Sequence, residues 1–269
     1  MSVTVLKLGG ELIEGVADLA RTADAVAALA RASRLVIVHG GGKAIDAELA
    51  RRGIAPLKRD GIRVTDEPTL ETAVTVLAGS ANTALVAALG ARGLRAVGLT
   101  GADDGLGLSE RVTEMETVSG AVVDPGLVGR PVSAGTARLI DHLSTAGFIP
   151  VIASIGVTSG GELLNVNADV MAAHVAGAIG AGRLIFAGGT AGVLDGAGSR
   201  IDALDNDGLE AMLADGSASA GMIAKLRACQ AARDAGVTDV RIVDGRDPAF
   251  SSGTRLMGGA ADRRPAAGN

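Results

Sequence analysis

Aromatic residues are almost absent from this 269-residue chain, which has three Phe and neither Trp nor Tyr. Many binders of single-stranded nucleic acid stack bases on aromatic side chains, so a stacking platform of that kind is excluded. The formal net charge of −5 gives no basic footprint for DNA or RNA either. The interior must therefore be built from Ala, Val, Leu and Ile, and hydrophobic residues make up 48% of the chain, as in ordinary globular proteins.

Cysteine occurs once, at Cys229, which excludes an intramolecular disulfide and is typical of a reducing compartment. Three scattered histidines show no metal-ligand spacing, so no residue is assigned as a metal ligand. The start, MSVTVLKLGG, lacks the charged and long apolar regions of a secretory signal. The longest uncharged apolar run, 143–161, contains Pro150 and four glycines and reads as a buried strand. These absences predict a cytoplasmic protein without a membrane span.

Short apolar runs alternate with alanine-rich helical patterns along most of the chain. The runs predict strands at 3–8, 35–38, 96–99, 149–154, 183–187 and 240–243, and the patterns predict helices at 16–32, 44–52, 69–91, 136–146, 168–179 and 221–235. Segments 111–123 and 191–201 alternate around glycine-containing turns and predict hairpins, and the tail 258–269 is expected to fray. This alternation predicts an α/β fold, a three-layer αβα sandwich with a central, mainly parallel sheet.

Glycines cluster where apolar strands end, in LKLGGE, VIVHGGGKA and IFAGGTAGV. Glycine lets backbone amides approach an anion closely, and the start of a following helix adds a favourable dipole. Glycines also form tight turns, but three such clusters favour a phosphate or carboxylate site. Neither a P-loop nor a dinucleotide fingerprint fits the spacing, so the design is a different one. Lys7 lies two residues before the first glycine of the first cluster, at a strand position where a lysine would ordinarily be solvated.

Other polar side chains have ordinary explanations that compete with functional ones. Arg63, in RDGIRVTDEPTLE, could grip a carboxylate with two hydrogen bonds, although a surface arginine is the simpler explanation. In ELLNVNADV, helix capping explains Asn167 and Asp169 but does not explain Asn165. Lys225 lies one turn into an apolar helix, where most lysines are solvated.

Taken together, these segments resemble the amino acid kinase family, and within it the branch that acts on N-acetyl-L-glutamate. The matching stretches are VLKLGGEL, VIVHGGGK, DGIRVTD, GFIPVIASIGVTSGGELLNVNAD, GVLDGAGSRI and GMIAKL, in family order up to about residue 259. The resemblance implies that ATP phosphorylates the side-chain carboxylate of N-acetyl-L-glutamate to an acyl phosphate, in arginine biosynthesis. It also implies Mg²⁺ held mainly by the nucleotide phosphates, and a homodimer.

The resemblance also implies roles for individual residues. The implied catalytic residues are Lys7, Lys225 and Asp169, with the lysines on the phosphates and the aspartate holding them in place. The implied substrate contacts are Gly41, Gly42, Arg63 and Asn165. The implied nucleotide contacts are Gly10, Thr190, Ala191, Gly192, Val193 and Leu194. Residues 1–180 would form the amino-acid-binding and dimerisation lobe and residues 181–269 the nucleotide-binding lobe, on one continuous sheet.

The chain departs from the family pattern at two places. Gly189, in AGGTAGVL, stands where relatives have an aspartate, which could loosen nucleotide contacts or be neutral because glycine amides bind phosphate themselves. Only Met1 and Ser2 precede the first predicted strand, whereas arginine-inhibited hexameric relatives carry an extra helix there. The expectation is therefore a dimer that arginine does not inhibit.

Two other functions stay open. A sibling kinase could act on glutamate or aminoadipate linked to a carrier protein, and the modest basic cluster Arg51, Arg52, Lys58 and Arg59 could receive the carrier, although such clusters are usually solvated faces. A catalytically silent, nucleotide-binding regulatory protein is the second alternative. Gly189 motivates that reading, and the retained lysines and aspartate speak against it.

Overall fold

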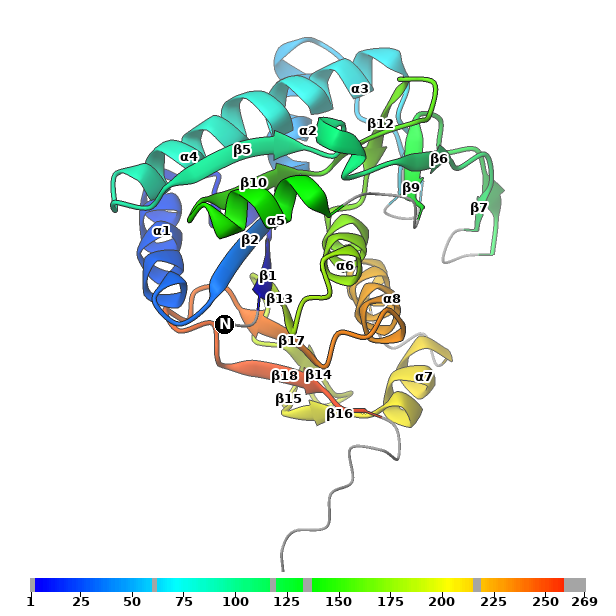
Figure 1. Ribbon diagram of the computed structural model, residues 1–269. Helices are drawn as coiled ribbons and strands as arrows, with labels where there is room; N and C mark the ends of the chain where they lie inside the picture. Colours follow the sequence, from blue (N-terminus) through cyan, green and yellow to red (C-terminus); the bar gives the residue numbers. More distant parts are fainter. Residues whose placement is uncertain (1–2, 60–61, 117–119, 133–136, 215–218, 259–269) are drawn as a thin grey trace, which may run out of the picture.

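An eight-stranded sheet forms the centre of the computed structural model, which describes residues 3–59, 62–116, 120–132, 137–214 and 219–258 (Figure 1). The strand order is β16-β18-β17-β13-β1-β2-β10-β5. The apolar runs predict six of these strands: β1 (Val3–Leu8), β2 (Arg34–His39), β5 (Ala96–Thr100), β10 (Ile149–Ala153), β13 (Arg183–Gly188) and β17 (Asp239–Asp244). Neighbours among these six pair in parallel, so their carboxyl ends meet along one edge.

Two short strands at one end of the sheet are not predicted by the sequence pattern. They are β16 (Ala203–Leu204) and β18 (Gly253–Leu256). β18 pairs antiparallel with β17, and β16 pairs with β18, which makes the sheet mixed. Segments of two and four residues are too short to show a reliable period of two. The predicted mainly parallel sheet is confirmed.

Helices cover both faces of the sheet (Figure 1). One face packs against α1 and α4 through side chains such as Val26 and Leu85. The other face packs against α5, α6 and α8 through side chains such as Met171 and Leu226. The bounds are α1 (Val16–Ala30), α4 (Asn82–Gly90), α5 (Arg138–Thr145), α6 (Ala168–Ala178), α7 (Asn206–Ala214) and α8 (Ala220–Asp234). The three-layer sandwich is therefore confirmed. Position 136 of the predicted helix 136–146 lies outside the described residues, and α7 is a helix that the sequence pattern does not predict.

The predicted helix 69–91 is one continuous helical segment that includes a π-helical stretch. It runs through α3 (Glu67–Val74), η2 (Thr75–Ala81) and α4. Asp66 caps its start by accepting a hydrogen bond from the amide of Thr69 at 3.0 Å. Among the described residues this is the one helix long and apolar enough to cross a membrane, yet 33% of its apolar window is buried. It is a partly buried core helix that packs against β5 and β10.

A smaller four-stranded sheet lies next to the carboxyl ends of β5 and β10, in the order β11-β12-β9-β6. Its strands are β6 (Ser109–Arg111), β9 (Val128–Pro131), β11 (Ile155–Val157) and β12 (Leu163–Val166). Both predicted hairpins form, as β7 (Met115–Glu116) with β8 (Val122–Val123) and β14 (Val193–Leu194) with β15 (Arg200–Ile201). Positions 117–119 in the first hairpin, and nearly all of the tail predicted to fray, lie outside the described residues.

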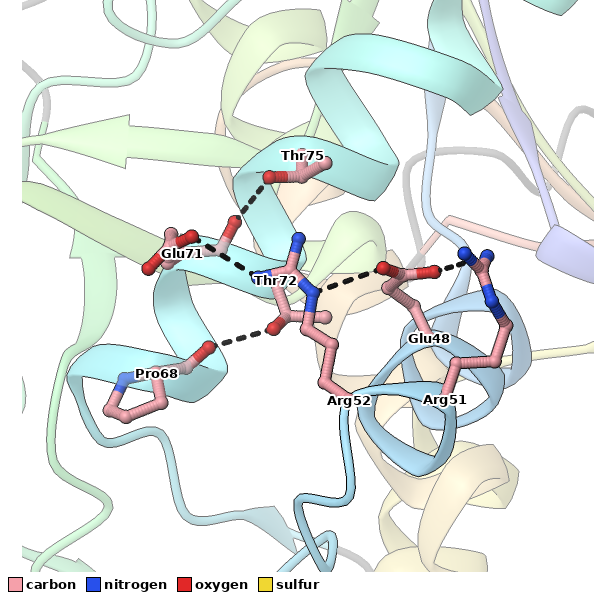
Figure 2. Close-up of polar contacts among 7 residues, drawn as sticks. All are labelled: Glu48, Arg51, Arg52, Pro68, Glu71, Thr72 and Thr75. Atoms are coloured by element: carbon pink, nitrogen blue, oxygen red, sulfur yellow. Dashed lines mark hydrogen bonds and ion pairs between the residues drawn. The ribbon is translucent and has the colours of Figure 1, made fainter.

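A small group of salt bridges lies at the end of α2 (Gly42–Arg51), and one of them reaches α3, as Figure 2 shows. Glu48 accepts hydrogen bonds from Arg51 at 2.6 Å and from Arg52 at 3.0 Å, and Arg52 also reaches Glu71 at 3.1 Å. Exposed pairs of this kind contribute little free energy one by one. Of these three pairs, the one between Arg52 and Glu71 joins the two helices, and the other two lie within α2 and its C-cap.

Candidate active site

Two lysines from opposite ends of the chain share one buried carboxylate. Lys7 Nζ lies 2.9 Å from Asp169 Oδ1, and Lys225 Nζ lies 3.3 and 3.4 Å from the two carboxylate oxygens. Lys7 comes from β1, Asp169 from the start of α6 and Lys225 from α8. Their side chains are only 10–14% exposed. The structure therefore brings the three predicted catalytic residues into direct contact.

Helix caps place the acidic and basic groups of this cluster. Asn167 begins α6 by accepting hydrogen bonds from the amides of Asp169 at 2.8 Å and Val170 at 3.2 Å. This is the capping expected from the sequence, and it sets Asp169 in the first turn, where the helix dipole favours a negative charge. Ser219 begins α8 in the same way, by accepting from the amide of Met222. Lys225 consequently points from the second turn of α8 toward α6.

Burial and mutual charge set the protonation of the cluster. Burial alone would raise the pKa of Asp169, but the positive charges and hydrogen bonds of Lys7 and Lys225 outweigh it and hold that pKa below its usual value. Burial, with the positive charge of Lys7, lowers the pKa of Lys225 despite the attraction of Asp169. The ring of Phe186 lies 5.8 Å from Lys225 Nζ and faces the same charge. A pair of lysines with one carboxylate between them leaves excess positive charge for an anion.

The first two glycine clusters pack directly on one another beside the lysines. A Cβ on Gly10 would lie 2.8 Å from the Cα of Gly41, so a side chain at position 10 would push the backbones apart. A Cβ on Gly40 would lie 3.1 Å from the Cβ of Ala168, at the start of α6. Gly42, at the start of α2, faces open space. The start of α2 thus lies beside the first glycine turn, with Gly42 exposed and Gly41 buried, and the start of a helix favours an anion.

Arg63 is held in place by an acid and a carbonyl, which sequence reasoning did not foresee. Its Nη2 lies 2.6 Å from Asp46 Oδ1 and donates to the carbonyl oxygen of Gly42 at 3.0 Å. Its Nη1 is buried and has no hydrogen-bond partner among the described residues. A buried unpaired guanidinium nitrogen is costly, and a ligand carboxylate would satisfy it.

Asn165 lies next to the segment that carries Arg63. Its Nδ2 donates to Thr65 Oγ1 at 3.2 Å, and Thr65 is fully buried two residues after Arg63. Asn165 belongs to β12 and pairs in register with Ile155 of β11 and Val128 of β9. Thr65 therefore connects the segment of Arg63 to Asn165 of the smaller sheet.

The third glycine cluster forms a separate turn after β13. Gly192 has φ 133°, a conformation that favours glycine, and a Cβ there would lie 2.7 Å from Thr254 Oγ1. The same hydroxyl accepts a hydrogen bond from the amide of Val193 at 2.8 Å, which fixes the turn to β18. The remaining predicted nucleotide contacts on this turn are exposed: Thr190, Ala191 and Leu194. Because β13 and β1 are neighbours, the turn opens on the same edge of the sheet as Gly10.

A buried histidine lies directly behind the second glycine cluster. His39 is fully buried at the end of β2, and burial lowers its pKa to about 4, so the ring is neutral. Its Nε2 lies 3.1 Å from the Nδ2 of Asn82, which also donates to the carbonyl oxygen of Val151 at 2.9 Å. These hydrogen bonds hold the end of β2 against α4 and β10. Sequence reasoning missed it, because a lone histidine beside glycines carries no signal for a partner 43 residues away.

Comparison with known proteins shows the family of this chain. The pattern of the amino acid kinase family matches residues 2–244. An acetylglutamate kinase of Sphingopyxis alaskensis is 41% identical over 251 residues, covering 91% of this chain and 82% of the relative. An acetylglutamate kinase of Methanopyrus kandleri is 37% identical over 89% of this chain and 94% of the relative. A crystal structure of N-acetylglutamate synthase from Neisseria gonorrhoeae shares the fold, with TM-score 0.81 at 22% identity over 96% of this chain and 60% of that one. The chain belongs to the amino acid kinase family.

Proposed function

We propose that this protein transfers the γ-phosphoryl group of ATP to the side-chain carboxylate of N-acetyl-L-glutamate, a step of arginine biosynthesis. Two acetylglutamate kinases are 41% and 37% identical to it over most of its length. The observation that carries the proposal is the contact of Lys7 and Lys225 with Asp169 at the meeting point of two glycine turns. That arrangement offers two cations and several amides to two anionic substrates.

The proposed mechanism depends on position and charge. A glutamate side chain has an unperturbed pKa near 4.3, so it is already ionised near neutral pH and needs no general base. One carboxylate oxygen attacks the γ-phosphorus, the bond to the β-phosphate oxygen breaks, and ADP leaves with that oxygen. The obstacle is the approach of two anions. Lys7 and Lys225 offset it by stabilising the charge on the transferring group, while Asp169 fixes both amines.

On the substrate side, Arg63 binds the α-carboxylate in this proposal. Its support is the buried Nη1 without a protein partner among the described residues, on a guanidinium already oriented by Asp46. The amides of Gly41 and Gly42 face the reacting carboxylate or the phosphoryl group in transit, since they begin α2 beside Gly10. Asn165 binds the acetamido end from the other side of Thr65.

On the nucleotide side, Gly10 and the turn formed by Thr190, Ala191, Gly192, Val193 and Leu194 bind ATP in this proposal. The support is that both turns open at the same sheet edge, on neighbouring strands. Mg²⁺ is proposed to enter with the nucleotide, because it dehydrates reluctantly and commonly binds through substrate phosphates. When bound, it neutralises part of the phosphate charge. Lys7 and Lys225 supply the remaining positive charge from the protein.

The proposed division of labour follows the sheet. Residues 1–180 hold the amino acid and form a homodimer, residues 181–269 hold the nucleotide, and the eight-stranded sheet runs through both. The proposed dimer interface is the outer face of the long α3–α4 segment beside the edge strand β5. Its support is an apolar helix with an exposed row of small residues, Thr75, Gly79, Thr83 and Ala87. The cytoplasm is the proposed compartment.

A carrier-linked substrate has weaker support. Three of the four cations in the basic cluster that could receive a carrier are paired within the chain. Arg51 and Arg52 pair with Glu48, and Lys58 pairs with Asp46. A regulatory protein without catalysis is also disfavoured, since both lysines and the aspartate are in contact as phosphoryl transfer requires.

The test traps the acyl phosphate as a hydroxamate in a reaction with ATP, Mg²⁺ and N-acetyl-L-glutamate, with free glutamate beside it. Product from the acetylated substrate alone is expected. Lys7→Ala and Lys225→Ala should each lower kcat by about 10²–10³, as does the loss of one preorganised electrostatic group. Arg227→Ala, an exposed cation on the same helix as Lys225, is the matched control and should leave kcat unchanged. Normal turnover in Lys7→Ala would falsify the mechanism, and no product from either acid would reject the substrate.

A further inference from the structure

Glu11 connects the turn after β1 with the turn after β13. It lies in η1 (Gly10–Leu12), and its Oε1 accepts a hydrogen bond from the amide of Gly189 at 2.7 Å. Cβ atoms built on Gly188 and Gly189 would each lie 3.4 Å from the same oxygen, and one on Gly9 would lie 2.5 Å from Oε2. The carboxylate of Glu11 therefore occupies the space that glycines leave at the ends of two neighbouring strands.

The turn that carries Glu11 is fixed on several sides. The amide of Gly9 donates to the carbonyl oxygen of Ala187 at 2.9 Å. Leu12 is buried and packs against Gly245, where a Cβ would lie 2.2 Å from Leu12 Cδ1. Since η1 is anchored to the ends of β13 and β17, the carboxylate is delivered from a rigid support.

A second carboxylate from the same segment reaches the opposite side of the site. Glu14 Oε1 accepts a hydrogen bond from the amide of Ala44, in the first turn of α2, at 3.2 Å. The segment after Lys7 thus contacts both the start of α2 and the turn after β13. Through Glu11 and Glu14 it holds the proposed substrate amides and the proposed nucleotide turn at a fixed separation from Lys7.

Gly189 has no side chain with which to hold its own turn. It is exposed, and the turn AGGTAG that contains it has three glycines, whose conformational freedom is the largest of any residue. A hydrogen bond to a carboxylate is about twice as strong as a neutral one. One such bond, from a rigid neighbour, adds to the bond between Val193 and Thr254 in favouring one conformation of the turn.

We propose that Glu11 is a positioning residue for ATP, which holds the turn 188–194 in its nucleotide-binding orientation in place of a side chain at Gly189. This rests on the proposed kinase function. In the opposite case, Glu11 would block an amide that a phosphate needs. A blocking group would have to move away when ATP binds, and the anchoring of η1 disfavours that movement. Removal of the Glu11 carboxylate would raise the KM for ATP if Glu11 positions the turn, and would lower it if Glu11 blocks the amide.

The experiment measures steady-state kinetics and the binding of a non-hydrolysable ATP analogue for Glu11→Ala and Glu11→Gln. Loss of one charge-assisted hydrogen bond should raise the KM for ATP and the Kd of the analogue about tenfold in Glu11→Ala. The kcat and the KM for N-acetyl-L-glutamate should stay within about twofold. Glu11→Gln keeps an acceptor oxygen and should lie near wild type. Glu210→Ala, an exposed acid of the same lobe as the nucleotide turn, is the control and should change nothing.

A second arm adds Gly189→Asp, whose backbone is outside the left-handed region and accepts a side chain. Alone, it should weaken ATP binding, because two carboxylates would crowd together. Combined with Glu11→Ala, it should recover most of the lost affinity. A lower or unchanged KM for ATP in Glu11→Ala, or a double variant worse than either single one, would overturn the proposal. Analogue binding keeps this test separate from the proposed reaction, because it compares the variants even if wild type fails to phosphorylate N-acetyl-L-glutamate.

Discussion

Lys225 is a buried lysine beside a carboxylate, and its pKa is shifted from the ordinary value. Burial and the positive charge of Lys7 lower its pKa from the ordinary 10.5. The proposed reaction needs its protonated form, so kcat/KM should fall as pH rises through this lowered pKa, below the range of an exposed lysine. In Lys225→Arg the residual activity should lose this alkaline limb, since arginine stays charged. If the alkaline fall of kcat/KM is identical in the wild type and in Lys225→Arg, a group other than Lys225 causes it.

The lowered pKa of the buried His39 predicts that the folded protein loses stability in mild acid. Its folded pKa of about 4 is lower than the unfolded value near 6.5, so the unfolded chain binds a proton first as pH falls. The contribution of the neutral ring is complete above pH 6.5 and is lost as pH falls toward 4. Between about pH 7.5 and about pH 5, wild type should lose about 2 kcal/mol more unfolding free energy than His39→Gln. Urea unfolding at both pH values measures the difference, and equal losses would contradict the assignment.

Among the elements, the contact between the first two glycine turns is the least tolerant of change. Gly10→Ala would place a Cβ 2.8 Å from the Cα of Gly41, where backbone must move. We expect kcat to fall at least about tenfold, since displacements of about 1 Å at a reacting centre have effects of that order or larger. Gly90→Ala, whose added Cβ meets no atom within 4 Å, is the control and should keep wild-type kcat. Unchanged kcat in Gly10→Ala would mean that the two turns need not touch.

The strand order explains why residues from distant segments of the chain meet at one edge of the sheet. β1, β2 and β13 are parallel neighbours, so their glycine turns open at one edge, and α6 and α8 deliver Asp169 and Lys225 to that edge. Carboxyl ends of strands in such sheets are where ligands bind. The smaller sheet adds Asn165, whose amide donates to Thr65, as a wall beside it.

For the whole molecule, the proposed homodimer depends on the exposed face of α3–α4. Ala87→Arg would put a charge on that face, and we expect it to convert the dimer to a monomer, because a desolvated unpaired charge is costly. Light scattering coupled to size-exclusion chromatography measures the mass. Ala28→Arg, at an exposed alanine of α1, is the matched control and should remain dimeric. If Ala87→Arg remains dimeric, the interface lies elsewhere. If the wild type is monomeric, the proposed homodimer is wrong.

The sequence by itself determined the elements that depend on local pattern. Apolar runs and helical periods identified six strands and the principal helices, because burial of one face leaves a period in the chain. Glycine clusters at strand ends, and the resemblance of the stretches around Lys7, Asp169 and Lys225, singled out the proposed catalytic residues that the fold brings into contact. Capping by Asn167 was also readable, since its partners are two and three residues away.

Only the tertiary structure decided contacts between residues distant in the chain. Asp46 with Arg63, His39 with Asn82, and Glu11 with Gly189 leave no periodic signal, because each pair forms only after strands and helices have packed. The short strands β16 and β18 likewise exist through their neighbours in the sheet. Local order follows from the spacing of side chains along one segment, whereas a partner 178 residues away is chosen by the geometry of the assembled sheet.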